Sequence, residues 1–213
     1  MKKVLALVAA AMLTTAAFAE KVVEVGLKGG LLLNAGTKMY MGDTKVDAGT
    51  KMSVGGDIGI FGHFGLAEIG SGALSLQPEL FFSIANGLKM DMFLYDVILK
   101  QNTLDIAVLL GYDIPLGKAR LTPFLGPKLG FAIGKGKSVA DGEKYENPEK
   151  TKGVGFGLDF GVGFAVPLGH FVLGADVRYG IDFTKFKFSD DDDFSQKIRR
   201  GALGINLTAG YRF

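Results

Sequence analysis

Residues 153–166 read GVGFGLDFGVGFAV, and their strict alternation decides the fold. Large apolar side chains hold the even positions from Val154 to Val166, whereas glycine, alanine and the single charge of Asp159 hold the odd ones. A period of two sends successive side chains to opposite faces of a β-strand, while a helix would mix them. The stretch therefore predicts a strand with one apolar face and one face of small residues.

The same alternation recurs in seven further segments of the chain. They are residues 23–33, 54–63, 74–84, 104–113, 121–133, 171–183 and 203–213. Each has the length of a tilted strand that crosses the hydrocarbon of a bilayer, about ten residues. Eight strands are enough to close a small barrel whose interior is filled by side chains.

The connections between these segments are alternately long and short. Long polar stretches lie at 34–52, 86–102, 134–152 and 184–201, and short connections with turn signals lie at 64–72, 115–119 and 167–170. Long outer loops and tight periplasmic turns are typical of outer-membrane barrels. We therefore predict an all-β fold, an eight-stranded antiparallel up-and-down transmembrane β-barrel. For residues 86–102 two predictions stay open, an extension of the flanking strands or a short helix in the loop.

Composition favours a membrane barrel over a barrel in water. The mean hydropathy is +0.27, yet beyond residue 20 no apolar run approaches the ~20 residues of a membrane-spanning helix. In a water-soluble barrel the polar face is rich in Lys, Glu and Thr, whereas here it carries mainly Gly, Ala and Ser. The opposite apolar face would be an aggregation hazard in water and suits contact with lipid.

The N-terminus has the pattern of a signal peptide. Residues 1–19 combine Lys2 and Lys3, an apolar run and the small-residue motif Ala17-Phe18-Ala19. We predict cleavage there, which leaves residues 20–213 as the barrel. Cleavage removes two of the 24 basic residues, so that 22 remain against 22 acidic ones. The basic excess of the whole chain therefore gives no argument for nucleic-acid binding.

Charged residues on the small-residue face are expected to point into the barrel. The predicted inward charges are Glu24, Lys28, Asp57, Glu79, Asp105, Lys128, Asp159, Asp176, Arg178 and Arg212. Buried charges must pair, so we predict an internal salt-bridge network. The many inward glycines leave space that water or a narrow pathway could fill, and the sequence leaves plug and pore both open.

Residues for a cofactor, a metal site or catalysis are scarce. The chain has no cysteine and two histidines, which argues against thiolate chemistry and histidine-rich metal sites. Residues 134–138, GKGKS, lack the first glycine of a phosphate loop, because that position is Phe131. The run Asp190–Asp193 lacks the spacing of a calcium loop and reads as a solvated outer loop. We expect no cofactor, no bound metal and no enzymatic activity.

The last residues resemble the assembly signal of outer-membrane barrels, with aromatic Tyr211 and Phe213 after apolar residues at alternate positions. This implies recognition by the barrel-assembly machinery and by periplasmic chaperones during biogenesis. Tyr112, Tyr179, Phe183, Tyr211 and Phe213 are expected to form aromatic girdles at the two membrane interfaces.

Nearly the whole mature chain resembles the small outer-membrane β-barrel families described as porin-like or PorT-like and, more loosely, OmpA/OmpX-type barrels. The matching stretches are VGLKGGLLLN (25–34), LSLQPELFFS (74–83), LDIAVLLGYDIPL (104–116), TPFLGPKLGF (122–131) and LDFGVGFAVPLGHFVLGADVRYGIDF (158–183). The resemblance implies a place in the outer membrane of a Gram-negative cell.

Two classes of function remain open. The first is a structural or interaction protein that contacts lipid and presents loops 34–52, 134–152 and 184–201 to a surface partner. The second is a narrow passive channel of the porin kind for small solutes.

Overall fold

The computed structural model describes residues 23–41, 44–46, 50–92, 95–140, 143–150, 154–187 and 196–213. The predicted signal peptide at 1–19 and the acidic run at 190–193 lie outside the described residues. Within them, no helix has the length and apolar character needed to cross a bilayer.

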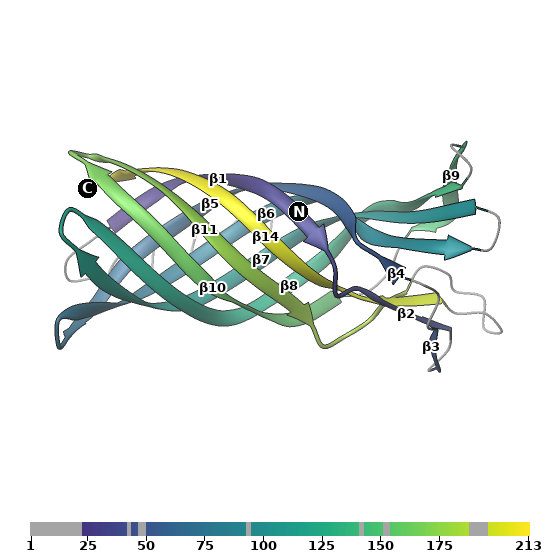
Figure 1. The fold of residues 1–213 in the computed structure, drawn as a ribbon, viewed down its shortest axis with the longest axis horizontal. Coiled ribbons are helices and arrows are strands. Elements are labelled where there is room, and N and C mark those ends of the chain that lie inside the picture. Colours follow the sequence, from purple (N-terminus) through teal and green to yellow (C-terminus); the bar gives the residue numbers. More distant parts are fainter. Residues whose placement is uncertain are drawn as a thin grey trace.

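Eight long strands close into one barrel (Figure 1). They are β1 (Val23–Asn34), β5 (Ser53–Ile69), β6 (Gly72–Met92), β7 (Tyr95–Leu116), β8 (Ala119–Ala140), β10 (Val154–Leu168), β11 (Phe171–Asp182) and β14 (Gly201–Arg212). Each pairs antiparallel with the next, and β14 pairs with β1 to close the wall. The prediction of an eight-stranded antiparallel up-and-down barrel is confirmed.

Two-residue turns join the long strands at one end of the barrel, which we call the turn end. Gly70, Gly117 and Gly169 each open such a turn with a φ of 62–67°, a left-handed conformation that glycine adopts without steric cost. The turn at 64–72 is shorter than the predicted connection, because β5 and β6 continue until only residues 70–71 remain between them. Strand pairing thus extends to the rim.

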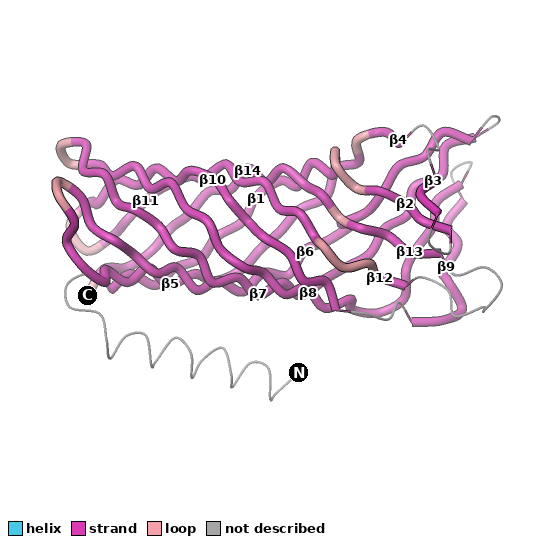
Figure 2. Tube along the Cα trace, turned by 90° about the horizontal axis from the view of Figure 1, so that it is seen from below, coloured by secondary structure: helices cyan, strands magenta, loops and turns pink. Residues whose placement is uncertain are grey.

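The opposite end, which we call the loop end, carries the remaining strands (Figure 2). Four of them, β2 (Lys38–Met41), β3 (Thr44–Val46), β12 (Phe186–Lys187) and β13 (Gln196–Arg199), pair antiparallel as a separate sheet in the order β12-β13-β2-β3. The other two, β4 (Thr50–Lys51) and β9 (Glu143–Lys150), pair with β6 and β8. Since β6 reaches Met92 and β7 begins at Tyr95, residues 86–102 extend the strands and form no helix in their described part.

The two faces of the wall differ as the alternation predicts. Leu27 and Leu207 are 65% and 72% exposed on the outside, as befits a surface that meets lipid. Inside, aromatic rings such as Phe81 and Phe124 join the charges. Gly161 leaves room for one of these rings, because a Cβ at this position would lie 2.8 Å from the Phe124 ring.

Candidate functional site

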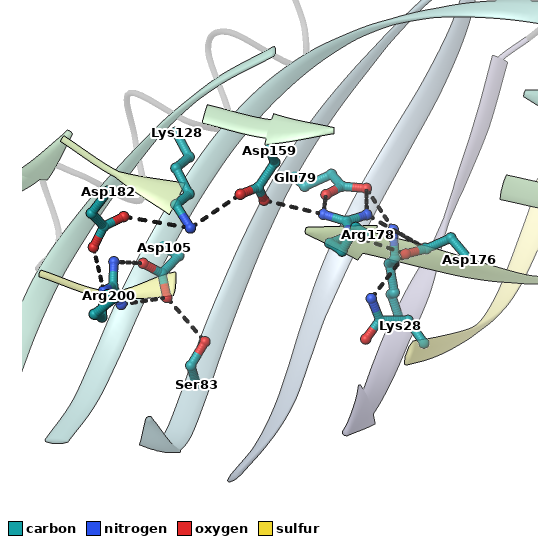
Figure 3. Close-up of polar contacts among 11 residues, drawn as sticks. Lys28, Glu79, Ser83, Asp105, Lys128, Asp159, Asp176, Arg178, Asp182 and Arg200 are labelled. Atoms are coloured by element: carbon teal, nitrogen blue, oxygen red, sulfur yellow. Dashed lines mark hydrogen bonds and ion pairs between the residues drawn. The ribbon is translucent and has the colours of Figure 1, made fainter. Parts of the chain in front are cut away.

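A cluster of four charged side chains crosses the middle of the lumen (Figure 3). Arg178 on β11 donates to both carboxylate oxygens of Glu79 on β6, at 2.5 and 3.0 Å, and to Asp176 at 3.0 Å. Lys28 on β1 donates to Glu79 at 2.8 Å and also pairs with Asp176. The cluster therefore ties together strands that lie on different sides of the barrel.

A second cluster lies toward the loop end and is linked to the first. Its cations are Lys128, which pairs with Asp159 at 3.1 Å and Asp182 at 3.4 Å, and Arg200, which donates to Asp182 at 2.5 Å and Asp105 at 2.8 Å. Hydroxyl groups complete it, because Ser83 and Thr103 donate to Asp105 at 2.9 and 2.6 Å.

Asp159 joins the two clusters into one chain of ion pairs. Its Oδ2 lies 3.6 Å from the guanidinium of Arg178, while its Oδ1 faces Lys128. We call the two linked clusters the lumen ion-pair chain. It consists of Lys28, Glu79, Asp105, Lys128, Asp159, Asp176, Arg178, Asp182 and Arg200.

Burial and aromatic rings shield the middle of this chain from bulk water. The side chains of Glu79 and Arg178 are 1% and 6% exposed. The guanidinium of Arg178 lies 5.3 Å from the Phe81 ring centre and 5.1 Å from that of Phe124, and the ammonium of Lys28 lies near the same two rings. Cation–π contacts of this kind strengthen when they are desolvated. Removing one partner of such a pair leaves an uncompensated buried charge.

A third group of charges closes the turn end. Glu24 is fully buried and accepts hydrogen bonds from Arg120 at 2.7 and 2.5 Å and from Arg212 at 2.6 Å. Nearby, the Nε2 of His63 lies 2.8 Å from Asp113. This group is separate from the lumen ion-pair chain, and we call it the turn-end plug. It consists of Glu24, His63, Asp113, Arg120 and Arg212.

The surroundings of His63 do not form a catalytic triad. The Ser75 hydroxyl donates to Asp113 at 3.3 Å, the same carboxylate that holds the imidazole, whereas a nucleophile would have to bond the imidazole itself. In the described ranges, no group of three or more His, Asp or Glu side chains is placed to hold a metal ion.

Asp57 departs from the predicted pairing. Its Oδ1 is buried without a hydrogen-bond partner, because Glu79 and Asp176 already take up Lys28 and Arg178. Asp57 lines a cavity of about 50 Å³ between the two clusters, which has room for a few water molecules. A second cavity of about 50 Å³ lies on the turn-end side of Lys28 and Glu79.

The structure brings together most of the predicted inward charges. Seven lie in the lumen ion-pair chain, Glu24 and Arg212 lie in the turn-end plug, and Asp57 stands beside them. The predicted network omitted Arg120, Asp113, Asp182, Arg200 and His63. The sequence indicates that Arg200 points inward, because it continues the even-numbered inward positions from Ala202 to Arg212. It was missed because it was assigned to the loop 184–201.

The C-terminal aromatic residues gather outside the wall at the turn end. Tyr211 is 41% exposed and Phe213 78% exposed. Their rings lie 5.1 Å apart edge-to-face, and Tyr211 also stacks on His170 at 5.4 Å. This aromatic cluster is exposed at the turn end of the barrel. Its role as an assembly signal stays a prediction.

Comparison with known proteins gives a family match and structural neighbours. A family model described as "Outer membrane protein beta-barrel domain" matches residues 4–213. The outer membrane protein OprG from Pseudomonas aeruginosa is 17% identical, with a TM-score of 0.57 over 92% of this chain and 98% of that one. A major outer membrane protein from Thermus thermophilus is 16% identical, with a TM-score of 0.51 over 91% of this chain and 100% of that one. A search among curated proteins gave no match.

Proposed function

We propose a function from one premise: this chain belongs to the outer membrane protein β-barrel family. Its place is accordingly the outer membrane. Within that family we assign it a structural or surface-interaction role, carried out with a lumen closed by paired charges. The loops 34–52, 134–152 and 184–201 would face a surface partner.

The lumen ion-pair chain is the observation that supports this role. Arg178 and Lys28 meet Glu79 and Asp176 across the barrel, and Asp159 continues the pairing to Lys128. A solute on its way through would have to separate charges that are 12% exposed or less. Each such separation leaves buried charges without partners, at a cost of several kcal/mol.

A narrow passive channel is the second candidate. In its favour, polar cavities lie on both sides of the layer formed by Lys28, Glu79 and Arg178. Asp57 gives the cavity nearer the loop end a carboxylate oxygen without a hydrogen bond. If water fills both cavities, this single layer of side chains is what separates them.

Conductance across a planar bilayer distinguishes the two candidates. With a closed lumen, the refolded wild-type protein gives a silent bilayer although it is folded and its gel mobility is heat-modifiable. Reproducible unitary steps from the wild type would reject the closed lumen and establish the channel.

Two variants test whether the ion pairs are what closes the lumen. Arg178→Ala and Lys128→Ala should each admit leak current and lower the unfolding temperature. Lys118→Ala is the matched control, because Lys118 is exposed on the turn at 117–118. Leak and stability that are the same in all three variants would contradict a role of the ion pairs in closing the lumen.

We also propose that the protein is not an enzyme, since His63 and Ser75 share one carboxylate instead of bonding each other. Tyr211 and Phe213 are proposed as the signal read by the barrel-assembly machinery, which their exposure at the end of the last strand supports.

A further inference from the structure

The mouth of the barrel at the turn end contains a cavity of about 440 Å³, which we call the turn-end cup. Its wall combines small or apolar groups, from Ala73, Pro115 and Pro167, with the charged side chains of Arg120 and Arg212. The cup is large enough for a small organic molecule, since ligand pockets in proteins begin at roughly 300 Å³.

The turn-end plug forms the floor of the cup. Arg120 on β8 reaches across the lumen to Glu24 on β1, and these two strands lie on opposite sides of the closed wall. Arg212 donates to the same carboxylate through its Nε at 2.9 Å and its Nη2 at 2.6 Å. Because Glu24 is fully buried, it holds both guanidinium groups in place at the base of the cup.

One nitrogen of Arg212 is left over from this plug. Within the part of the chain that the structure describes, its Nη1 makes no hydrogen bond and no ion pair. The side chain of Arg212 is 31% exposed and lines the cup. An anchored guanidinium with unused N–H groups is a donor for an anionic oxygen that enters the cup.

The acidic groups of the cup limit which anions it can accept. Asp113 lines the cup, and its side chain is 15% exposed and lies 2.8 Å from the Nε2 of His63. Glu68 lines the cup as well. Two carboxylates repel an anion with two or three charges more strongly than an anion with one. Together with the apolar part of the wall, they favour a singly charged organic anion over phosphate or sulfate.

We propose that the turn-end cup binds a small organic carboxylate with one negative charge and an apolar body. The carboxylate accepts hydrogen bonds from the Nη1 of Arg212, and the body lies against Ala73, Pro115 and Pro167. Hydrogen bonds between arginine and a carboxylate are charge-assisted and roughly twice as strong as neutral ones. The cup lies on the turn side of the lumen ion-pair chain, so binding does not depend on whether the lumen conducts.

Fluorine NMR on the refolded protein in phosphatidylcholine nanodiscs tests this site. The probe is 4-fluorobenzoate, and 4-fluorobenzamide is its uncharged analogue of similar shape. We expect the protein to broaden the signal of 4-fluorobenzoate and to leave that of 4-fluorobenzamide sharp. R212Q should weaken the binding of 4-fluorobenzoate about ten-fold or more, which corresponds to the loss of a hydrogen bond to a charged group. K38Q changes an exposed lysine at the loop end and should bind as the wild type does.

Two further variants separate a built site from general attraction to positive charge. Lys118 also lines the cup but is exposed on the turn and is not held by Glu24. K118Q should therefore weaken binding much less than R212Q does. A73L fills the cup with a larger side chain and changes neither arginine, so it should abolish binding. This variant tests the site even if R212Q does not fold.

Four results would overturn the proposal. The first is no binding of 4-fluorobenzoate by the folded wild type. The second is equal binding of 4-fluorobenzoate and 4-fluorobenzamide, which would show that the charge is not recognised. The third is an equal loss in K118Q and R212Q, which would reduce the effect to net charge at the turn end. The fourth is undiminished binding by A73L with heat-modifiable gel mobility, which would place the probe outside the cup.

Discussion

Glu79 holds two cations at once. It accepts hydrogen bonds from Lys28 and from Arg178, and it is 1% exposed. Glu79→Gln removes the charge and nearly preserves the shape, so both cations lose a buried counter-ion. We expect the variant to lose about 3–5 kcal/mol of stability. Urea unfolding in detergent micelles, followed by tryptic digestion or by gel mobility, measures this.

Glu68→Gln is the control for that loss. Glu68 is exposed next to the turn at 70–71, where substitutions usually change stability by less than about 0.5 kcal/mol. A loss of the same size in both variants would show that the location of Glu79 within the lumen does not matter.

Two glycines on β10 form a matched pair. A Cβ at Gly161 would come closest to the Val177 carbonyl oxygen of the barrel wall and would lie 2.8 Å from the Phe124 ring, whereas at Gly163 the nearest atoms are 3.8 Å away. Gly161→Ala should therefore cost about 1–3 kcal/mol through overpacking, while Gly163→Ala should be close to neutral. Equal midpoints of unfolding for the two variants would argue against close packing around Gly161.

Sequence alone predicted single residues well where the alternation was unbroken. Asp176 and Arg178 follow the inward row of one strand, so parity predicted that they point into the lumen, but their pairing with Glu79 was not predicted. The state of Asp57 did not follow, because its oxygen lacks a partner only after Glu79 and Asp176 have taken the nearby cations. That competition depends on distances across the lumen, which no local pattern contains.

At the scale of elements, parity fails between β1 and β2. Leu32 and Asn34 point inward on β1, but Met39 points inward on β2, so the alternation shifts by one residue between them. The backbone bends at residues 35–37, where Gly36 also makes room for the Tyr179 hydroxyl. A period of two does not tell which face a residue takes beyond such a bend. Residues 34–52 were therefore predicted only as a polar loop.

The small sheet offers a prediction at this scale. Phe186 on β12 is 2% exposed, and its ring lies 4.6 Å from the guanidinium of Arg200. Phe186→Ala removes this buried ring, and a buried Phe→Ala change costs about 3–5 kcal/mol. Because the long strands pair independently of this sheet, we expect local opening: protease should cut the loop end while the barrel core keeps its heat-modifiable mobility.

Phe183→Ala serves as the comparison, since Phe183 is exposed on the outer wall. Cleavage of both variants at the same rate would mean that Phe186 does not fasten the sheet.

For the whole molecule, buried and exposed charges should respond differently to salt. Between low salt and about 1 M, the Debye length falls from about 30 Å to about 3 Å, which screens exposed pairs but hardly affects buried ones. We expect the unfolding midpoint of the barrel in neutral micelles to stay nearly constant, because its charges pair inside the lumen. A steep decline of the midpoint with salt would contradict the burial of these ion pairs.

The seam between β1 and β14 has a consequence for the timing of assembly. Glu24 stands opposite Arg212 in the register and accepts its hydrogen bond at 2.6 Å, although 188 positions separate the two residues. The first strand of the barrel therefore waits for the last one, and its second edge stays unpaired until β14 is in place. A chain that lacks β14 has two open edges, and of the two arginines that bind Glu24 it keeps only Arg120. The arrival of β14 thus decides when the wall can close.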